Sequence, residues 1–217
     1  VLLLSGTNDS LNFEIKQKLE SFLENGKKIF LAQAGVKTDI QQQQASIINS
    51  DIFQFLSQYG LKVKNNLVLD DQCQSVQVQE RRGIFMMNRA MKYPFFPNIK
   101  NFNKNEFIVS DLEQVVPFFP SEIALDTNEI EIVAGTAELF RTSNKSGIME
   151  NNFYLSPDPQ QNPFISILNQ TGKIVSATSR LLNGGELILV SDTKFLSDEA
   201  GMSVPDNLTF LLNTADY

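Results

Sequence analysis

The sequence of 217 residues contains no histidine, no tryptophan and a single cysteine, Cys73. Without histidine, the chain alone cannot assemble a Ser-His-Asp or Cys-His catalytic site, and a common zinc ligand is missing. A lone cysteine cannot form an intramolecular disulfide. A Ser-Lys or carboxylate-pair mechanism stays open, because it depends on a geometry that the sequence does not reveal. We therefore predict no catalytic residue, no metal site and no cofactor.

Long hydrophobic runs are also absent. No segment reaches the roughly 18 to 20 apolar residues that a membrane-spanning helix needs, and the opening VLLLSG is too short for a signal peptide. Val1 to Leu4 have the composition of a core strand whose upstream context is missing. We expect residues 1–217 to form one domain, cut from a longer chain whose membrane anchors lie outside it.

Basic residues are scarce, since 18 Lys and Arg stand against 25 Asp and Glu and give a net charge of −7. This balance argues against a nucleic-acid surface spread over the whole domain. The deficit is uneven, however, because Arg81 to Lys104 holds six basic residues and no acidic one. Its basic residues include Arg81, Arg82 and Arg89, and it is also rich in aromatic residues and methionine.

Three interpretations fit this basic aromatic segment. Aromatic, Met and Arg side chains are enriched at the centres of interfaces, which favours a contact surface for a partner through Arg81, Arg82 and Arg89. Alternatively, Phe95, Phe96, Phe102 and Phe107 fill a small satellite core while the cations face water. Stacking on nucleic acid is the weakest interpretation, because the surrounding domain is acidic and no RNP-type motif is present.

Hydrophobic spacing predicts helices followed by strands. Apolar residues recur at helical intervals in Asp51 to Tyr59, Gly60 follows as a helix end favours, and a period-two pattern then runs from Val63 to Leu69. A second such unit comprises a helix over Phe13 to Leu23 and a buried strand over Lys27 to Ala34. Further along, Glu186 to Ser191 reads as a buried strand after Gly184 and Gly185. Alternating helices and strands predict an α/β sheet domain.

The middle of the chain interrupts this pattern. We expect a polar connection over Gly35 to Gln44, one or two strands over Gln74 to Met87, and an irregular or edge excursion where prolines recur, with a short helix over Asp111 to Phe119. A strand pair over Glu129 to Phe140 follows, then a loop over Asn151 to Pro163. The remaining predicted elements are two strands, Phe164 to Leu168 and Lys173 to Ala177, and a final helix over Asn207 to Ala215.

Candidate ligand-binding residues lie where predicted strands end, because open α/β sheets bind ligands beyond the carboxyl ends of their strands. Asp70 and Asp71 follow one strand, and Asp192 and Thr193 follow another. These carboxylates suit a cation, a hydroxylated ligand or a basic side chain, although an aspartate after a strand commonly caps a helix or closes a turn.

A third candidate combines Thr142 and Ser143, whose hydroxyl and backbone N–H groups suit an anion beside Arg141. Turn formation explains these two residues as well. Cys73 follows no strand-elbow-helix signature of a nucleophile.

Six segments, taken in order, resemble the family of auxiliary components of ABC-type transport systems associated with gliding motility. They are LESFLENGKKIFL (Leu19 to Leu31), FLSQYGLKVKNNLVLDDQC (Phe55 to Cys73), YPFFPNI (Tyr93 to Ile99), LFRTSNKSG (Leu139 to Gly147), GGELILVSDTKFLSD (Gly184 to Asp198) and NLTFLLNTADY (Asn207 to Tyr217). Each is weak alone, since a helix, a glycine and a strand recur across α/β proteins.

The resemblance implies a Rossmann-like or amidotransferase-like α/β fold, with a mostly parallel sheet flanked by helices and an irregular or β excursion in the middle. It implies a substrate-binding-like domain on the extracytoplasmic (periplasmic) face of a bacterial inner membrane, beside an ABC permease and ATPase. We expect a non-enzymatic accessory or binding domain that contacts these subunits or an unidentified small ligand, and no nucleic acid. A hydrolase-like or amidotransferase-like enzyme and a cell-wall glycan-binding module are the alternatives.

Overall fold

The computed structural model describes residues 1–7, 9–82, 85–126, 128, 130–166, 168–198 and 201–216, and only the backbone of Arg82 and Phe85. Three α-helices are described: α1 (Phe13–Glu24), α2 (Ile52–Gln58) and α3 (Pro205–Asp216). The described strands are β1 (Leu2–Ser5), β2 (Lys28–Ala32), β3 (Val36–Asp39), β4 (Gln44–Ile47), β5 (Leu61–Val63), β6 (Asn66–Asp70), β7 (Cys73–Arg82), β8 (Phe85–Pro97), β9 (Asn101–Phe102), β10 (Ile123–Leu125), β11 (Val133–Arg141), β12 (Ser146–Glu150), β13 (Ile174–Leu181) and β14 (Glu186–Val190). Short 3₁₀ turns lie at Phe107–Val109, Pro163–Ser166 and Gly201–Ser203.

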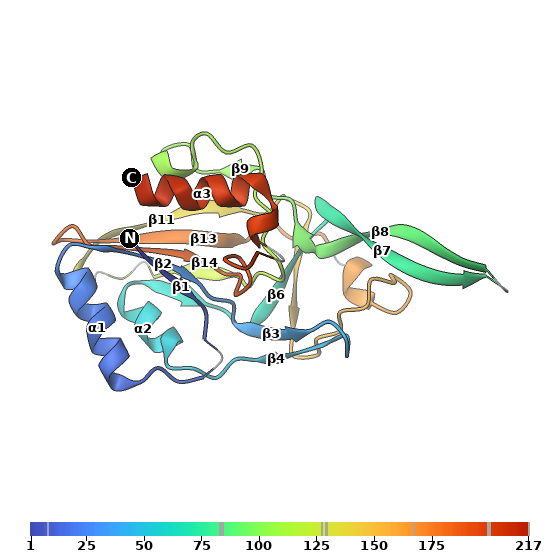
Figure 1. Cartoon of the computed structure of the whole chain (residues 1–217), viewed down its shortest axis with the longest axis horizontal. Coiled ribbons are helices and arrows are strands. Elements are labelled where there is room, and N and C mark those ends of the chain that lie inside the picture. The colour runs from blue at the N-terminus through green and yellow to red at the C-terminus, as the bar shows by residue number, and fades with distance from the viewer. Residues whose placement is uncertain are drawn as a thin grey trace.

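A six-stranded mixed sheet forms the centre of the molecule, in the order β1-β2-β14-β13-β11-β9. The neighbours β1, β2 and β14 run parallel, whereas β13, β11 and β9 continue the sheet in antiparallel pairs. Strands β2 and β14 are apolar on both faces, as strands covered on two sides must be. Figure 1 shows these strands side by side, with helices above and below them.

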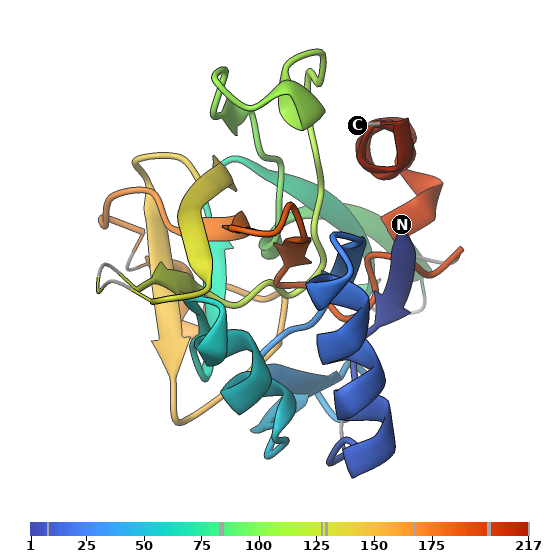
Figure 2. The same ribbon diagram turned by 90° about the vertical axis from the view of Figure 1, so that its left-hand side faces the viewer.

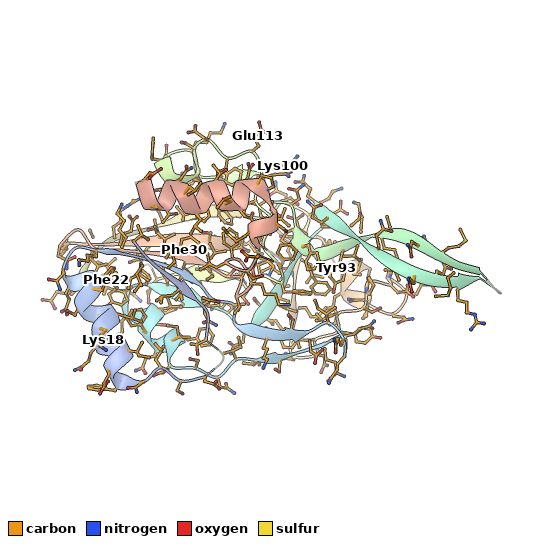
Figure 3. All side chains as sticks on the ribbon, in the orientation of Figure 1. Lys18, Phe22, Phe30, Tyr93, Lys100 and Glu113 are labelled. Atoms are coloured by element: carbon orange, nitrogen blue, oxygen red, sulfur yellow. The ribbon has the colours of Figure 1, made fainter. Side chains whose placement is uncertain are left out.

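Helices cover the two faces of this sheet because alternate residues of the buried strands point in opposite directions. Ile29 and Leu187 face a core shared with α1 and α2, whereas Phe30 and Ile188 face a core shared with α3. The Phe30 ring contacts the rings of Phe195 and Phe210, and its position under α3 is visible in Figure 3. The turned view in Figure 2 places α3 on the opposite side of the sheet from α1 and α2.

The predicted fold class, a mostly parallel Rossmann-like or amidotransferase-like sheet flanked by helices, is wrong. The protein is mostly β, with about 40% of residues in strands and 20% in helices, and it has several small mixed and antiparallel sheets. The two N-terminal helix-strand units are present, but within the described residues no α-helix lies between β5 and β14. Between β13 and β14 only residues 182–185 intervene, and so short a connection joins antiparallel strands. Gly184 in this turn has a φ of 87°, which suits glycine.

Within the described residues, four two-stranded sheets accompany the central one, and they pair β10 with β5, β12 with β6, β3 with β4, and β7 with β8. The hairpin of β7 and β8, Cys73–Pro97, projects beyond the rest of the molecule in Figure 1, and we call it the arm. A third buried cluster anchors its base, where Tyr93 and Phe95 pack with Phe119. The Tyr93 hydroxyl donates a 2.7 Å hydrogen bond to the Leu155 carbonyl, and Figure 3 shows Tyr93 at this junction.

The expected irregular or edge excursion takes the form of the arm, in which the proline-containing segment is part of the 13-residue strand β8. Pro94 and Pro97 are accommodated where the β7–β8 ladder shifts its register, between Cys73 and Ser75. Each arm strand is paired on one side, and prolines are tolerated at such edges and irregularities. The satellite-core interpretation is confirmed for Phe95 and Phe96, which pack in the third cluster.

Some of the other local predictions are confirmed and others are wrong. The final helix is confirmed, and the loop predicted over 151–163 is confirmed up to residue 162. The strand predicted over 164–168 is wrong, since Pro163–Ser166 forms a 3₁₀ turn, and the helix over 111–119 is absent, since this segment is irregular in the structure. Residues 35–44 are not a simple connection, because they contribute to the β3–β4 hairpin. The expected strand pair over 129–140 is the single strand β11, with Glu129 outside the described residues.

Candidate functional site

Asp192 lies just past β14, at the carboxyl end of the three parallel strands, and is fully buried. Its two carboxylate oxygens accept hydrogen bonds from backbone N–H groups, Oδ2 from Phe118 at 2.8 Å and Oδ1 from Lys194 at 2.7 Å. Burial raises the pKa of Asp192 to about 7, although these N–H groups and the Lys194 charge act in the opposite direction. The group therefore changes charge near neutral pH, which is unusual for an aspartate.

A cavity of about 160 Å³ opens beside this carboxylate, and residues from β3, the Phe118 loop and the segment after β14 line it. Thr193 is also a lining residue, but its hydroxyl oxygen already accepts a 3.1 Å hydrogen bond from the Ala34 backbone N–H. Lys37 and Lys194 supply the cations of the lining. The cavity is small for a typical ligand pocket, and ligand binding by Asp192 and Thr193 stays a prediction.

Asp70 and Ser143, predicted separately, are brought together in the structure. Asp70 ends β6 and accepts hydrogen bonds from the Ser143 backbone N–H at 2.5 Å, the Ser143 hydroxyl at 2.6 Å and the Gln72 N–H at 2.9 Å. Burial raises the pKa of Asp70, while the Ser143 hydrogen bonds oppose the shift. Both side chains are buried, so their polar atoms join β6 to the segment after β11.

Thr142 serves a similar internal link. Its hydroxyl oxygen accepts a 2.7 Å hydrogen bond from the Lys173 N–H, and its own N–H donates to the Lys173 carbonyl. Arg141, the expected anion partner, forms an ion pair with Glu138. Asp71 lies at the base of the arm and forms a 3.2 Å ion pair with Lys92. Anion or ligand binding by Thr142, Ser143, Asp70 and Asp71 stays a prediction.

Cys73 begins β7 and lacks the features of an activated nucleophile. Burial raises the pKa of its thiol, with smaller contributions from neighbouring charges that act in both directions. A raised pKa keeps the sulfur protonated at neutral pH, whereas catalytic cysteines have lowered values. The part of the chain that the structure describes contains no group of three or more side chains able to hold a metal ion.

The predicted contact residues Arg81, Arg82 and Arg89 all lie in the arm. Arg81 and Arg89 are exposed. The ladder pairs Arg81 with Met86 and Val78 with Arg89, so the two arginines whose side chains are described lie on opposite faces of the ribbon. The arm has four basic residues and one acidic residue, Glu80, in contrast to the acidic remainder of the chain.

A groove of about 450 Å³ separates the arm from the loop over 156–161. The arm wall includes the apolar Val78 and Met91 and the charged Glu80 and Arg89, and the loop contributes Ser156, Asp158 and two glutamines. The loop keeps its shape through Asn162, whose side-chain amide donates to the Tyr154 and Ser156 carbonyls at 2.9 and 3.1 Å. A lining that combines apolar side chains, amides and both signs of charge suits an extended polypeptide better than a small apolar ligand.

Comparisons with known proteins identify the family of the chain and a solved structure with a similar fold. The model of the family described as "ABC-type uncharacterized transport system" matches residues 1–214. The chain belongs to this family. It is an auxiliary component of an ABC-type transport system. None of the curated proteins matches the chain.

Among solved structures, this auxiliary component is similar to one described as "mmIFT52 N-terminal domain", with a TM-score of 0.59 and 14% identity. The match covers 99% of this chain and 74% of that one. At this identity the similarity shows a shared fold alone. No helix within the described ranges is long and apolar enough to cross a membrane.

Sequence reasoning missed the loop over 156–161 as a partner of the arm. Its polar composition predicted a loop, and nothing in a single sequence indicated what the loop faces. The available signal was in the arm itself, where Val76 and Val78 alternate with glutamines on one strand and methionines recur on the other. This pattern predicts a half-covered ribbon whose apolar side needs a neighbour.

Proposed function

We propose that this protein is a non-enzymatic accessory domain that binds the membrane-embedded permease, and through it associates with the ATPase, of an ABC-type transport system of the gliding-motility type. The family match over residues 1–214 carries the proposal. The domain acts by binding on the extracytoplasmic face, while helices outside this segment hold it at the membrane. The protonated thiol of Cys73 and the absence of histidine support a role without catalysis.

The groove between the arm and the loop over 156–161 is the surface that we assign to the protein partner. Its arm wall carries the apolar side chains of Val78 and Met91 beside the cation of Arg89, a combination found at interface centres. Gln160 and Gln161 offer amide groups that can pair with the backbone of an extended segment. We therefore expect an exposed segment of the permease to bind here.

The test is affinity purification of the tagged full-length protein from its own membranes in mild detergent, with the co-eluting proteins identified. Recovery of the permease and the ATPase is expected. Val78→Asp should lower that recovery, because it places a charge on the apolar wall of the groove. Gln77→Asp is the matched control, since the neighbouring residue lies on the other face of the ribbon.

Three results would count against the proposal. Recovery of the protein alone, at good yield, would remove the transport-complex role. Turnover of ester, amide or glycoside substrates that is lost in Cys73→Ala would favour a hydrolase-like enzyme instead. A saturable thermal shift with cell-wall fragments that is abolished by Val78→Asp would assign the groove to a glycan.

A further inference from the structure

The tip of the arm combines exposed apolar side chains with cations. Met86 is 62% exposed and Met87 is 54% exposed, although methionine is normally buried. Arg81 and Arg89 are exposed beside them. In the sequence, the run from Ile84 to Met87 contains four apolar residues and no charge, and basic residues flank it on both sides.

The register shows how these side chains are arranged. Met86 pairs with Arg81 on one face of the ribbon, while Met87 pairs with Glu80 on the other face, which also carries Arg89. Each face of the tip thus presents one methionine and one arginine, and the face of Met87 also carries Glu80, the one acidic residue in the sequence of the arm. Arg89 is two residues nearer the body than Met87, which is about 7 Å along a strand. Because both faces of the tip carry an apolar and a basic side chain, the tip suits a partner surface that contacts its end. It suits less well a partner that packs along one face of the ribbon.

We propose that the tip, defined by Arg81, Met86, Met87 and Arg89, inserts into the surface of an anionic lipid bilayer. The methionines enter the boundary of the acyl chains, and the arginines bind the phosphates of the headgroups above them. The charge distribution favours anionic lipid as the occupant, because the arm has four basic residues against one acidic residue, whereas the rest of the chain has 14 basic and 24 acidic residues. An anionic membrane attracts the arm and repels the body. This inference does not depend on the proposed transport role.

Because the sequence contains no tryptophan, the emission of a single introduced tryptophan can be measured without background from other tryptophans. Met87→Trp introduces a single tryptophan at the tip, and its emission is measured with vesicles of phosphatidylcholine containing about 30% phosphatidylglycerol. We expect a blue shift and quenching by bromines placed on the acyl chains, and neither with pure phosphatidylcholine. Leu182→Trp is the control, since Leu182 is 71% exposed in the β13–β14 turn, at the other end of the molecule in Figure 1.

Charge reversal separates specific insertion from general attraction. The double variant Arg81→Glu/Arg89→Glu should reduce co-sedimentation with the anionic vesicles at least tenfold. Lys18→Glu/Lys64→Glu makes the same change in net charge at exposed positions of the body and should leave co-sedimentation nearly unchanged. Matching thermal melts establish that both variants are folded.

Unchanged tryptophan emission of the Met87→Trp variant with anionic vesicles would overturn the proposal. If Arg81→Glu alone, which leaves the groove residue Arg89 unchanged, also failed to recover the permease in detergent, the tip would be a protein contact instead. Equal losses in the two double variants would show attraction by net charge alone and would equally overturn insertion by the tip. Because the vesicles contain no permease or ATPase, the outcome of the vesicle experiments is independent of whether a transport complex is recovered.

Discussion

The ends of the strands in the body and the tip of the arm use polar and apolar side chains in opposite ways. In the body, Asp70, Thr142 and Asp192 are buried, and their oxygens accept hydrogen bonds from other parts of the same chain. At the tip, two methionines and two arginines are exposed. The polar groups that the sequence indicated as candidate ligand-binding residues therefore stabilise the fold through internal hydrogen bonds.

This difference indicates where the protein can be changed without unfolding. An exposed apolar side chain adds little to stability, so its presence at a projecting tip is better explained by an external contact. A buried carboxylate that accepts several hydrogen bonds holds segments in place, and its loss leaves donors without partners. The following experiments measure the contrast between the two regions, from the largest expected effect to the smallest.

Phe30→Ala should have the largest effect, a loss of about 3 to 5 kcal/mol in the free energy of unfolding. The side chain is fully buried between β2 and α3, where its ring meets Phe195 and Phe210. Urea denaturation measures the loss, and Leu182→Ala at an exposed turn is the control. A loss below about 1 kcal/mol would mean that α3 does not pack on this face of the sheet.

The elements that form this core are also those that the sequence predicts best. Helical spacing located α1, α2 and α3, and continuous apolar runs located β2 and β14, because burial on a given face imposes its period on the sequence directly. Whether neighbouring strands run parallel or antiparallel could not be predicted from the hydrophobic pattern. A run such as Ile174–Leu181 looks the same in a parallel or an antiparallel sheet, so the fold class failed while the elements were largely found.

The candidate sites show a similar limit. Local sequence placed Asp70 and Ser143 at the ends of strands, but their contact joins residues 73 positions apart and depends on the topology. The arm was visible as an unusual composition, yet its prolines argued against the long strand that β8 forms. The edge position that tolerates those prolines is a property of the three-dimensional fold.

The free energy of unfolding should depend on pH because the buried carboxyl group of Asp192 titrates. Because its pKa is raised from 3.8 to about 7, the folded protein holds this proton more tightly than the unfolded chain. The contribution of Asp192 to stability is therefore fully present below about pH 4 and is lost as the pH rises through about 7. The loss is at most about 4 kcal/mol.

Asp192→Asn removes this titration, so its unfolding free energy should fall less between pH 4 and pH 8 than that of the native protein. Chemical denaturation at several pH values measures the two slopes. Parallel curves would show that the Asp192 carboxyl is hydrated in the folded protein and that its pKa is ordinary.

Asp70→Ala should cost about 2 to 3 kcal/mol, because it leaves the Ser143 N–H, the Ser143 hydroxyl and the Gln72 N–H without their acceptor. The neighbouring substitution Asp71→Ala is the matched control. It removes an exposed ion pair with Lys92 and should cost less than about 1 kcal/mol. Thermal unfolding of both variants compares the two carboxylates directly, and equal losses would remove the distinction between a buried link and a surface pair.

The tip should give the smallest effect on stability, and this is the sharpest test of the contrast. Met86→Ser/Met87→Ser should change the free energy of unfolding by no more than about 0.5 kcal/mol, as surface substitutions usually do. Both side chains are more than half exposed, and the base of the arm is held separately by Tyr93 and Phe95 in the third cluster. The same variant should lose association with anionic vesicles. A stability loss above about 1 kcal/mol would show instead that the tip packs against the body, and its methionines would then belong to the fold and not to an external contact.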